Sequence, residues 1–216
     1  MLDKFIGDAM MAGFGVPLPS EDAADAAVRS SIAMISELRK WNADRLKTDK
    51  MPVGMGVGVN TDNVVTGNIG SSKRMDFTMI GDGVNLAARL EGSCKTYGAQ
   101  IIISEFTQTK LKGIYALREL DRIVVKGKTE PVSIFEVLDF HDDETFPARM
   151  DVVGHFTEGL AHYRNTKFDD AIKSFKAALD ANSEDVPSKL YIERCELFKK
   201  SPPPKDWSGE WVMTEK

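Results

Sequence analysis

The chain has little cysteine, no long apolar run and no basic leader. Its two cysteines, Cys94 and Cys195, fit no metal-ligand or redox spacing, and thiols without a disulfide framework are typical of a reducing compartment. No apolar run approaches the roughly 18 residues that a membrane helix needs, and the first residues lack the features of a secretory signal. We therefore expect a cytoplasmic chain, without excluding a membrane anchor in a longer parent protein.

An excess of positive charge is also missing. The 216 residues include 28 Lys and Arg against 33 Asp and Glu, which gives a formal net charge of −5 and argues against a nucleic-acid-binding surface. Apolar residues make up 42% and charged residues 28% of the chain, as in ordinary globular proteins. The length predicts one domain of ordinary size with a small appendage.

The N-terminal part alternates between strand and helix patterns. Residues 2–15 predict a β-hairpin with a Gly-Asp turn. Beyond two prolines, Ser20 is the expected N-cap of a long amphipathic helix that runs to about Arg45. A second hairpin is expected from two glycine-containing segments, residues 53–59 and 64–69.

The following segment predicts the rest of a layered fold. A helix is expected over residues 82–97, and a shorter one near residues 105–111. Strands interleaved with helices favour an α/β (α+β) sandwich in which helices cover a mixed sheet. The remaining strands are expected at residues 77–80, 101–103, 115–125 and 132–138.

The C-terminal part has a different pattern. An acidic, turn-prone linker is expected at residues 140–152, after a domain over residues 1–139. Small and large apolar residues then recur over residues 153–200 with the spacing of a tetratricopeptide-like helical hairpin and a third helix. Because one such repeat buries little core alone, we expect it to pack on the preceding domain or on a partner. Residues 201–216 predict a stiff Pro/Trp tail with two exposed aromatic side chains.

Two stretches resemble the catalytic signatures of class III nucleotidyl cyclases: residues 4–15, KFIGDAMMAGFG, and residues 76–91, DFTMIGDGVNLAARLE. The resemblance covers residues 2 to about 139. It implies a ferredoxin-like α/β sandwich, and an adenylate cyclase that converts ATP to cyclic AMP and pyrophosphate in cyclic-nucleotide signal transduction. Guanylate cyclases share the family.

The resemblance makes Asp8 one of two carboxylates that bind two Mg²⁺ or Mn²⁺ ions. An isolated Gly-Asp pair is most often a simple turn, but the surrounding motif favours a metal ligand. In the cyclisation, the 3′-oxygen of the nucleotide attacks the α-phosphorus of the same molecule. Hard cations that bind oxygen ligands neutralise the negative charge of the phosphates during this attack.

The resemblance also makes Lys4 and Thr78 the residues that bind the base. Adenine presents an acceptor at N1 beside a donor amine, while a lysine only donates and a threonine hydroxyl can accept. Guanine has the reverse polarity at this edge, and guanylate-making relatives usually carry Glu and a small residue such as Cys here. Without the motif, Lys4 would be interpreted as an exposed lysine of an edge strand.

Three further residues are assigned to catalysis and to binding of the leaving group. Asn85 and Arg89 lie four residues apart and therefore on one face of a helix; a solvated polar face is the common fate of such a pair. In the family the Asn orients the ribose, and the Arg stabilises the pentacoordinate phosphorus where negative charge develops. Lys126 corresponds to the lysine that contacts the departing pyrophosphate, whereas spacing alone would suggest only a basic turn.

The family works as a head-to-tail homodimer with composite sites, in which one protomer supplies the metal carboxylates and the other supplies the five remaining residues. Family members also carry a further strand and two helices before the segment with which this chain begins, and the other metal Asp lies on that strand. We therefore expect an N-terminally incomplete cyclase domain that alone is inactive or barely folded.

Two other functions stay open. The chain could be a catalytically dead module that binds ATP or heterodimerises with an intact cyclase. It could also be an interaction protein whose helical C-terminus binds a protein partner.

Overall fold

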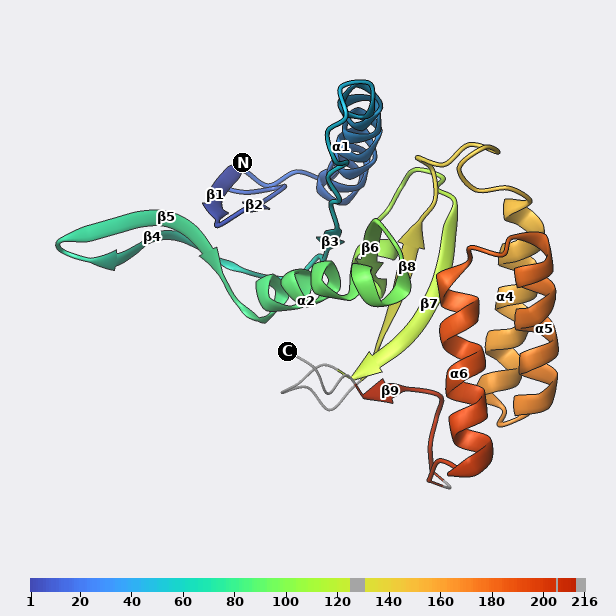
Figure 1. The fold of residues 1–216 in the computed structure, drawn as a ribbon. Coiled ribbons are helices and arrows are strands. Elements are labelled where there is room, and N and C mark those ends of the chain that lie inside the picture. Colours follow the sequence, from blue (N-terminus) through green and yellow to red (C-terminus); the bar gives the residue numbers. More distant parts are fainter. Residues whose placement is uncertain (125–130, 205, 213–216) are drawn as a thin grey trace. The chain divides into compact units, whose positions relative to one another are not determined.

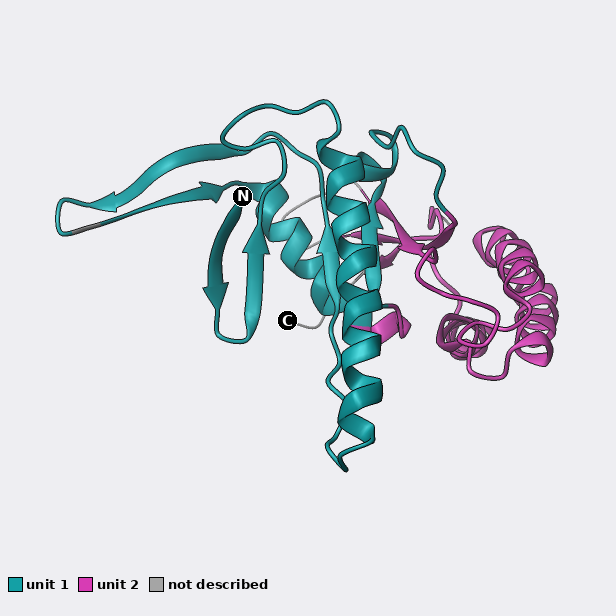
Figure 2. Ribbon diagram, turned by 90° about the horizontal axis from the view of Figure 1, so that it is seen from above, with its two compact units in different colours: residues 1–94, 100–115 teal, residues 95–99, 116–216 magenta. Residues whose placement is uncertain are grey.

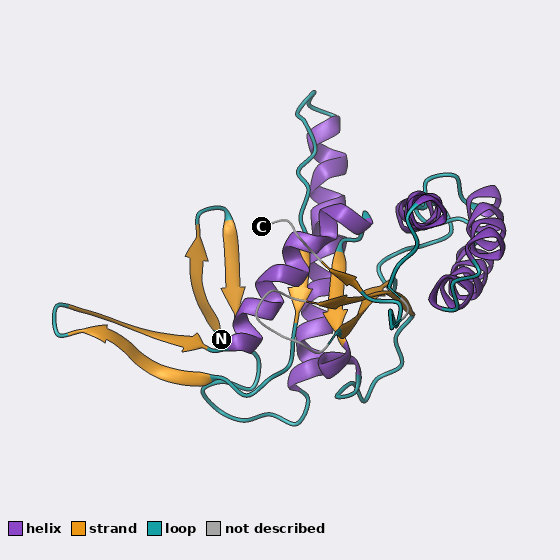
Figure 3. Ribbon diagram, turned by 90° about the horizontal axis from the view of Figure 1, so that it is seen from below, coloured by secondary structure: helices purple, strands orange, loops and turns teal. Residues whose placement is uncertain are grey.

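The computed structural model describes residues 1–124, 131–204 and 206–212. The chain forms two compact units (Figure 1; Figure 2). Unit 1 comprises residues 1–94 and 100–115, and unit 2 comprises residues 95–99 and 116–216. Strands and helices alternate as expected for a mixed α+β fold (Figure 3). Among the described helices, none is both long and apolar enough to span a membrane.

Unit 1 combines two hairpins, one parallel strand pair and the helices that follow them. The hairpin of β1 and β2 and the helix α2 lie where the sequence predicts them. In chain order the elements are β1 (Leu2–Ile6), β2 (Ala9–Ala12), α1 (Ala23–Leu46), β3 (Val57–Val59), β4 (Val65–Ser71), β5 (Arg74–Ile80), α2 (Asp82–Tyr97), β6 (Ile101–Ser104) and α3 (Glu105–Gln108). The last turn of α2 is assigned to unit 2.

The second hairpin has other partners than the sequence predicts. The expected pairing of residues 53–59 with residues 64–69 is wrong, because β4 pairs with β5, and β3 pairs in parallel with β6. Side-chain contacts at the end of β3 explain the difference. Asn60 donates from Nδ2 to the Gly83 carbonyl oxygen at 3.0 Å and accepts from Ser104 Oγ at 2.6 Å. These bonds hold the residues after β3 at α2 and β6, so that the chain does not turn back there.

Helix α1 is confirmed, but its expected cap is not. Val28 and Ile35 are fully buried on one stripe of the helix, as an amphipathic pattern requires. The N-cap is Asp22 rather than Ser20. Ser20 Oγ instead accepts from the backbone N–H of Asp22 at 3.3 Å, within the turn that precedes the helix.

The buried carboxylate of Asp25 in α1 binds the loop that follows α3. Asp25 accepts hydrogen bonds from the backbone N–H groups of Lys112 at 3.0 Å and Gly113 at 2.8 Å, and from the hydroxyl of Tyr115 at 3.0 Å. The bond from Lys112, followed by those from the other two residues, lowers the pKa of Asp25 below its ordinary value. The ionised form is therefore the one that holds this loop.

Unit 2 consists of three paired strands and three helices among its described residues. Strand β7 pairs antiparallel with β8 and parallel with β9. The elements are β7 (Leu117–Val124), β8 (Val132–Val137), α4 (Arg149–Arg164), α5 (Phe168–Ala181), α6 (Val186–Lys200) and β9 (Trp211–Val212). Helix α4 begins inside the stretch expected as a linker, and Phe146 of that stretch packs with Leu138 and Val152.

The helices share an aromatic core. Helices α4 and α5 approach so closely that a Cβ on Gly159 would lie 2.6 Å from the ring of Phe175, so only glycine fits there. The small-and-large spacing of the sequence therefore does mark a helix contact. The buried residues of this core are Phe156, Leu160, Tyr163, Ala171, Ile172, Phe175, Tyr191 and Cys195.

The two tryptophans of the tail are not exposed, which corrects the sequence-based expectation. Trp207 is partly buried and packs edge-on against Tyr163, with ring centroids 5.1 Å apart, and its indole N–H donates to the Glu210 carbonyl oxygen at 2.8 Å. Trp211 lies in β9, and the guanidinium of Arg194 is 4.1 Å from its ring centroid. The tail is thus folded back onto the helices and strands of unit 2.

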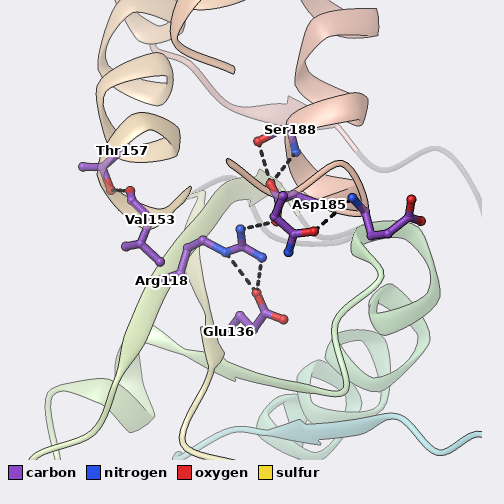
Figure 4. A network of polar contacts seen from close by, with 8 residues as sticks. Arg118, Glu136, Val153, Thr157, Asp185 and Ser188 are labelled. Atoms are coloured by element: carbon purple, nitrogen blue, oxygen red, sulfur yellow. Dashed lines mark hydrogen bonds and ion pairs between the residues drawn. The ribbon is translucent and has the colours of Figure 1, made fainter. Parts of the chain in front are cut away.

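Buried ion pairs join the helices to the strands of unit 2. Arg118 of β7 lies between two carboxylates, Glu136 of β8 and Asp185 at the start of α6 (Figure 4). Asp185 also caps α6 by accepting from the backbone N–H of Ser188 at 3.1 Å. A second pair joins Arg194 of α6 to Asp121 of β7. The helical segment therefore packs on strands of its own chain, one of the two outcomes expected from the sequence.

We predict that Arg118→Met strongly destabilises unit 2. Arg118 is 3% exposed, and its loss would leave Glu136 and Asp185 buried without their cation, at a cost of about 3–5 kcal/mol. Urea unfolding, followed by circular dichroism, measures this change. Arg122→Met, which changes a half-buried arginine of the same strand, is the control and should cost far less. Equal losses for both variants would contradict the structural role of the buried pairs.

We also predict an acid-sensitive contribution from Asp25. Because its pKa is lowered in the folded chain, its stabilisation is present above about pH 4 and is lost as the pH falls through the folded pKa. Asp25→Asn should therefore lower the melting temperature at pH 7 and leave a smaller drop between pH 7 and pH 3. Glu37→Gln, at an exposed position of the same helix, is the control. An unchanged acid dependence in Asp25→Asn would refute the prediction.

Candidate functional site

The two residues predicted to bind the base lie together, around a residue that the sequence analysis missed. Thr78 of β5 is 7% exposed and donates from its hydroxyl to Asp3 Oδ2 at 2.7 Å. Lys4 Nζ of β1 is 3.9 Å from the other carboxylate oxygen, Oδ1 of Asp3. The structure thus brings Lys4 and Thr78, which are 74 positions apart in the sequence, to one carboxylate.

A β-bulge makes this arrangement possible. Leu2 is opposite Ala12, whereas Lys4 is opposite Met11, so Asp3 is the extra residue of β1. In an unbroken strand, neighbouring side chains point to opposite faces. A bulge breaks this alternation and re-aims a side chain, which lets Asp3 and Lys4 approach each other. The only signal in the sequence is that Asp3 directly precedes Lys4.

The hairpins meet through a second contact as well. A Cβ on Gly13, just after β2, would lie 2.4 Å from the sulfur of Met79. The absent side chain of Gly13 leaves room for Met79, the neighbour of Thr78 in β5. This contact helps to hold β5 beside the first hairpin.

Asp8 lies in the exposed turn between β1 and β2. The turn needs Gly7, whose φ of +64° is in the left-handed region that favours glycine. Within the described ranges, no group of three or more His, Cys, Asp or Glu residues could hold a metal ion. Asp8 offers one exposed carboxylate at this turn.

Asn85 and Arg89 lie on the exposed face of α2, while Leu86 and Leu90 of the same helix are buried. Glycine sets the position of this helix. A Cβ on Gly58 of β3 would lie 2.2 Å from the Ala87 carbonyl oxygen, so α2 could not pack on β3 with any larger residue there. The predicted pair thus projects outward from a helix that is fixed against the core of unit 1.

Lys126, the residue predicted to bind the leaving pyrophosphate, lies outside the described residues. Of the predicted site residues, Lys4 and Thr78 are brought together, Asn85 and Arg89 share one helix face, and Asp8 lies at a turn. Asp3 lies between the two residues that the sequence predicts to bind the base.

Residues 4–138 match the family described as adenylate and guanylate cyclase catalytic domain. The chain is 34% identical over 200 residues to the terminal-differentiation-specific adenylate cyclase of Dictyostelium discoideum. This match covers 90% of the present chain and 9% of the relative. It is 40% identical over 143 residues to an adenylate cyclase of Anabaena cylindrica. This match covers 63% of the present chain and 28% of the relative. The chain therefore spans less than a third of the length of each of these relatives.

Solved structures show the same fold. The guanylyl cyclase Cya2 is 36% identical with a TM-score of 0.58, over 63% of this chain and 68% of that chain. The adenylyl cyclase CyaB from P. aeruginosa is 35% identical with a TM-score of 0.56, over 66% and 73%. The likeness to these structures includes both adenylyl and guanylyl cyclases. The chain belongs to the adenylate and guanylate cyclase catalytic-domain family.

Proposed function

We propose that this chain is the catalytic domain of an adenylate cyclase, which converts ATP to cyclic AMP and pyrophosphate. The observation that carries the proposal is the placement of Lys4 and Thr78 around one buried carboxylate. The lysine ammonium donates to adenine N1, and the threonine hydroxyl accepts from the adenine amine. A guanine base would present a donor to the lysine and an acceptor to the threonine.

The residues of α2 act on the sugar and the phosphate. In the reaction, the 3′-hydroxyl of ATP loses its proton to water and its oxygen bonds to the α-phosphorus. The bond from that phosphorus to the bridging oxygen breaks, and pyrophosphate leaves. Asn85 orients the ribose, and the Arg89 guanidinium stabilises the charge on the pentacoordinate phosphorus. Lys126 compensates the charge of the departing pyrophosphate.

The two Mg²⁺ or Mn²⁺ ions stay a prediction, with Asp8 as one ligand. A single carboxylate holds two divalent ions poorly, because hard cations need several oxygen ligands. We therefore expect the chain alone to bind ATP but to turn it over slowly. The second candidate function is a module that binds ATP and completes a site together with another cyclase protomer.

The proposed active form is a head-to-tail homodimer, or a heterodimer with a related cyclase. Large apolar side chains on the two hairpins are exposed in the single chain, and exposed apolar patches are typical of interaction surfaces. Two-stranded hairpins are also marginally stable alone. The exposed residues include Leu2, Phe5, Ile6 and Met10 on the first hairpin and Val65, Met75, Phe77 and Ile80 on the second.

Two further predictions accompany the proposal. The proposed cytoplasmic location is supported by Cys94 and Cys195, which are both buried thiols. A protein partner for the C-terminal helices stays a prediction. We also retain the proposal that helices α4, α5 and α6 form a tetratricopeptide-like segment. Much of their apolar surface is already used within unit 2, which favours the cyclase over a helical interaction protein.

We predict that the chain prefers adenine and that two substitutions abolish this preference. Binding of 3′-deoxyATP and 3′-deoxyGTP, which lack the attacking hydroxyl, is measured by calorimetry in the presence of Mg²⁺. The unsubstituted chain should bind the adenine nucleotide at least about tenfold more tightly, the effect of one or two hydrogen bonds. Lys4→Glu combined with Thr78→Cys should lose this preference, because both groups proposed to bind the adenine edge are replaced. Equal binding of both nucleotides by the unsubstituted chain would contradict the proposed base specificity.

We also predict that this chain completes a site in a mixed dimer. The cyclase domain of the Anabaena relative, with its residue aligned with Arg89 replaced by alanine, should be nearly inactive alone. Added to the present chain, it should regain cyclic AMP production, because one composite site takes its arginine from this chain. The Arg89→Ala variant of this chain is the control and should give about 10²–10³ times less product. Equal rescue by both chains would disprove the assigned role of Arg89.

A further inference from the structure

Asp3 is a buried carboxylate that the assigned reaction does not use. Its side chain is 1% exposed, and within the described part of the chain its Oδ1 has no hydrogen-bond partner. A buried charged oxygen without such a partner is costly, and each such group calls for an explanation. The ammonium of Lys4 lies 3.9 Å from this oxygen.

The contact with Thr78 fixes what that hydroxyl can do. A hydroxyl has one proton to donate, and an ionised carboxylate can only accept. Because Thr78 donates its proton to Asp3 Oδ2 at 2.7 Å, its remaining lone pairs can only accept from a ligand. The adenine amine is a donor and suits these lone pairs, whereas the guanine carbonyl oxygen at the same position is an acceptor and would be repelled.

We propose that Asp3 is a specificity-determining positioning residue: its carboxylate makes Thr78 an obligate acceptor and orients the Lys4 ammonium, so that the pocket binds adenine and rejects guanine. Asp3 touches neither the reacting atoms nor the base, and it acts through the two residues that do. This inference rests on the proposed function, because it explains how the same pair of residues discriminates between the two bases.

The bulge in β1 is the backbone feature that serves this role. It places Asp3 and Lys4, which are adjacent in the chain, close enough for their charges to interact, although regular alternation would separate them. Oδ1 attracts the ammonium, while Oδ2 binds the threonine. One carboxylate thus coordinates a donor-only and an acceptor-only side chain, the combination that matches the edge of adenine.

The experiment compares the binding of 3′-deoxyATP and 3′-deoxyGTP to four forms of the chain: unsubstituted, Asp3→Ala, Thr78→Val and the double variant. Without Asp3, the Thr78 hydroxyl can rotate and donate to the guanine carbonyl oxygen. Asp3→Ala should therefore reduce the preference for the adenine nucleotide about tenfold. In the Thr78→Val background the same substitution should have a much smaller effect on the preference, because the hydroxyl through which it acts is absent.

Asp3→Asn is the conservative variant, which keeps the shape and one acceptor oxygen, and it should retain more of the preference than Asp3→Ala. Asp44→Asn, in an exposed ion pair of α1, is the matched control and should leave both affinities unchanged. Circular dichroism and thermal melting confirm that each variant is folded. If Asp3→Ala unfolds the chain, the comparison is made with Asp3→Asn, which should still shift the preference measurably toward guanine.

The outcomes separate the two proposals. If the unsubstituted chain prefers the adenine nucleotide, and every folded Asp3 variant keeps the same ratio of affinities, the role of Asp3 is refuted while the proposed function stands. A purely structural Asp3 would weaken both nucleotides by the same factor. If the unsubstituted chain has no preference for adenine, or binds neither nucleotide, the proposed function and this inference both fail.

Discussion

The hydrogen bond from the Thr78 hydroxyl to the buried carboxylate of Asp3 underlies the proposed base specificity. It joins β5 to the bulge in β1 and thereby brings two sequence motifs to one place. In the proposed site it also decides which polarity Thr78 presents to a purine base, because a hydroxyl that has donated its only proton can then only accept. The assignment of base specificity follows from this bond and from the lysine beside it.

A different constraint governs unit 2. Its strands β7 and β8 carry charged side chains into the interior, where Arg118 and Arg194 pair with carboxylates of the strands and of α6. Such pairs contribute less to net stability than their number suggests, but breaking one is costly. They join the helical segment to strands β7 and β8 of the same unit, which lie within the family match. The similarity to the Dictyostelium relative spans 200 residues, and so also extends beyond residue 138.

Much of the fold could be predicted from local patterns, because α2, the first hairpin and the helices of unit 2 each show a regular periodicity. The pairing of β3 and β4 could not, since it depends on Asn60, whose partners are distant in sequence. The same holds for Trp207 and Trp211, which appear exposed in an isolated tail and are covered only in the folded chain. Motif resemblance predicted Lys4, Thr78, Asn85 and Arg89 as candidate site residues. Asp3 was missed because a bulge cannot be detected from strand alternation.

The most direct test of the central claim is a crystal structure of the chain with 3′-deoxyATP. We predict that the adenine amine lies within hydrogen-bond distance of Thr78 Oγ1, that N1 lies at the ammonium of Lys4, and that Thr78 keeps its bond to Asp3. An adenine base bound elsewhere on the chain, or a Thr78 hydroxyl turned away from Asp3 in the complex, would contradict the account.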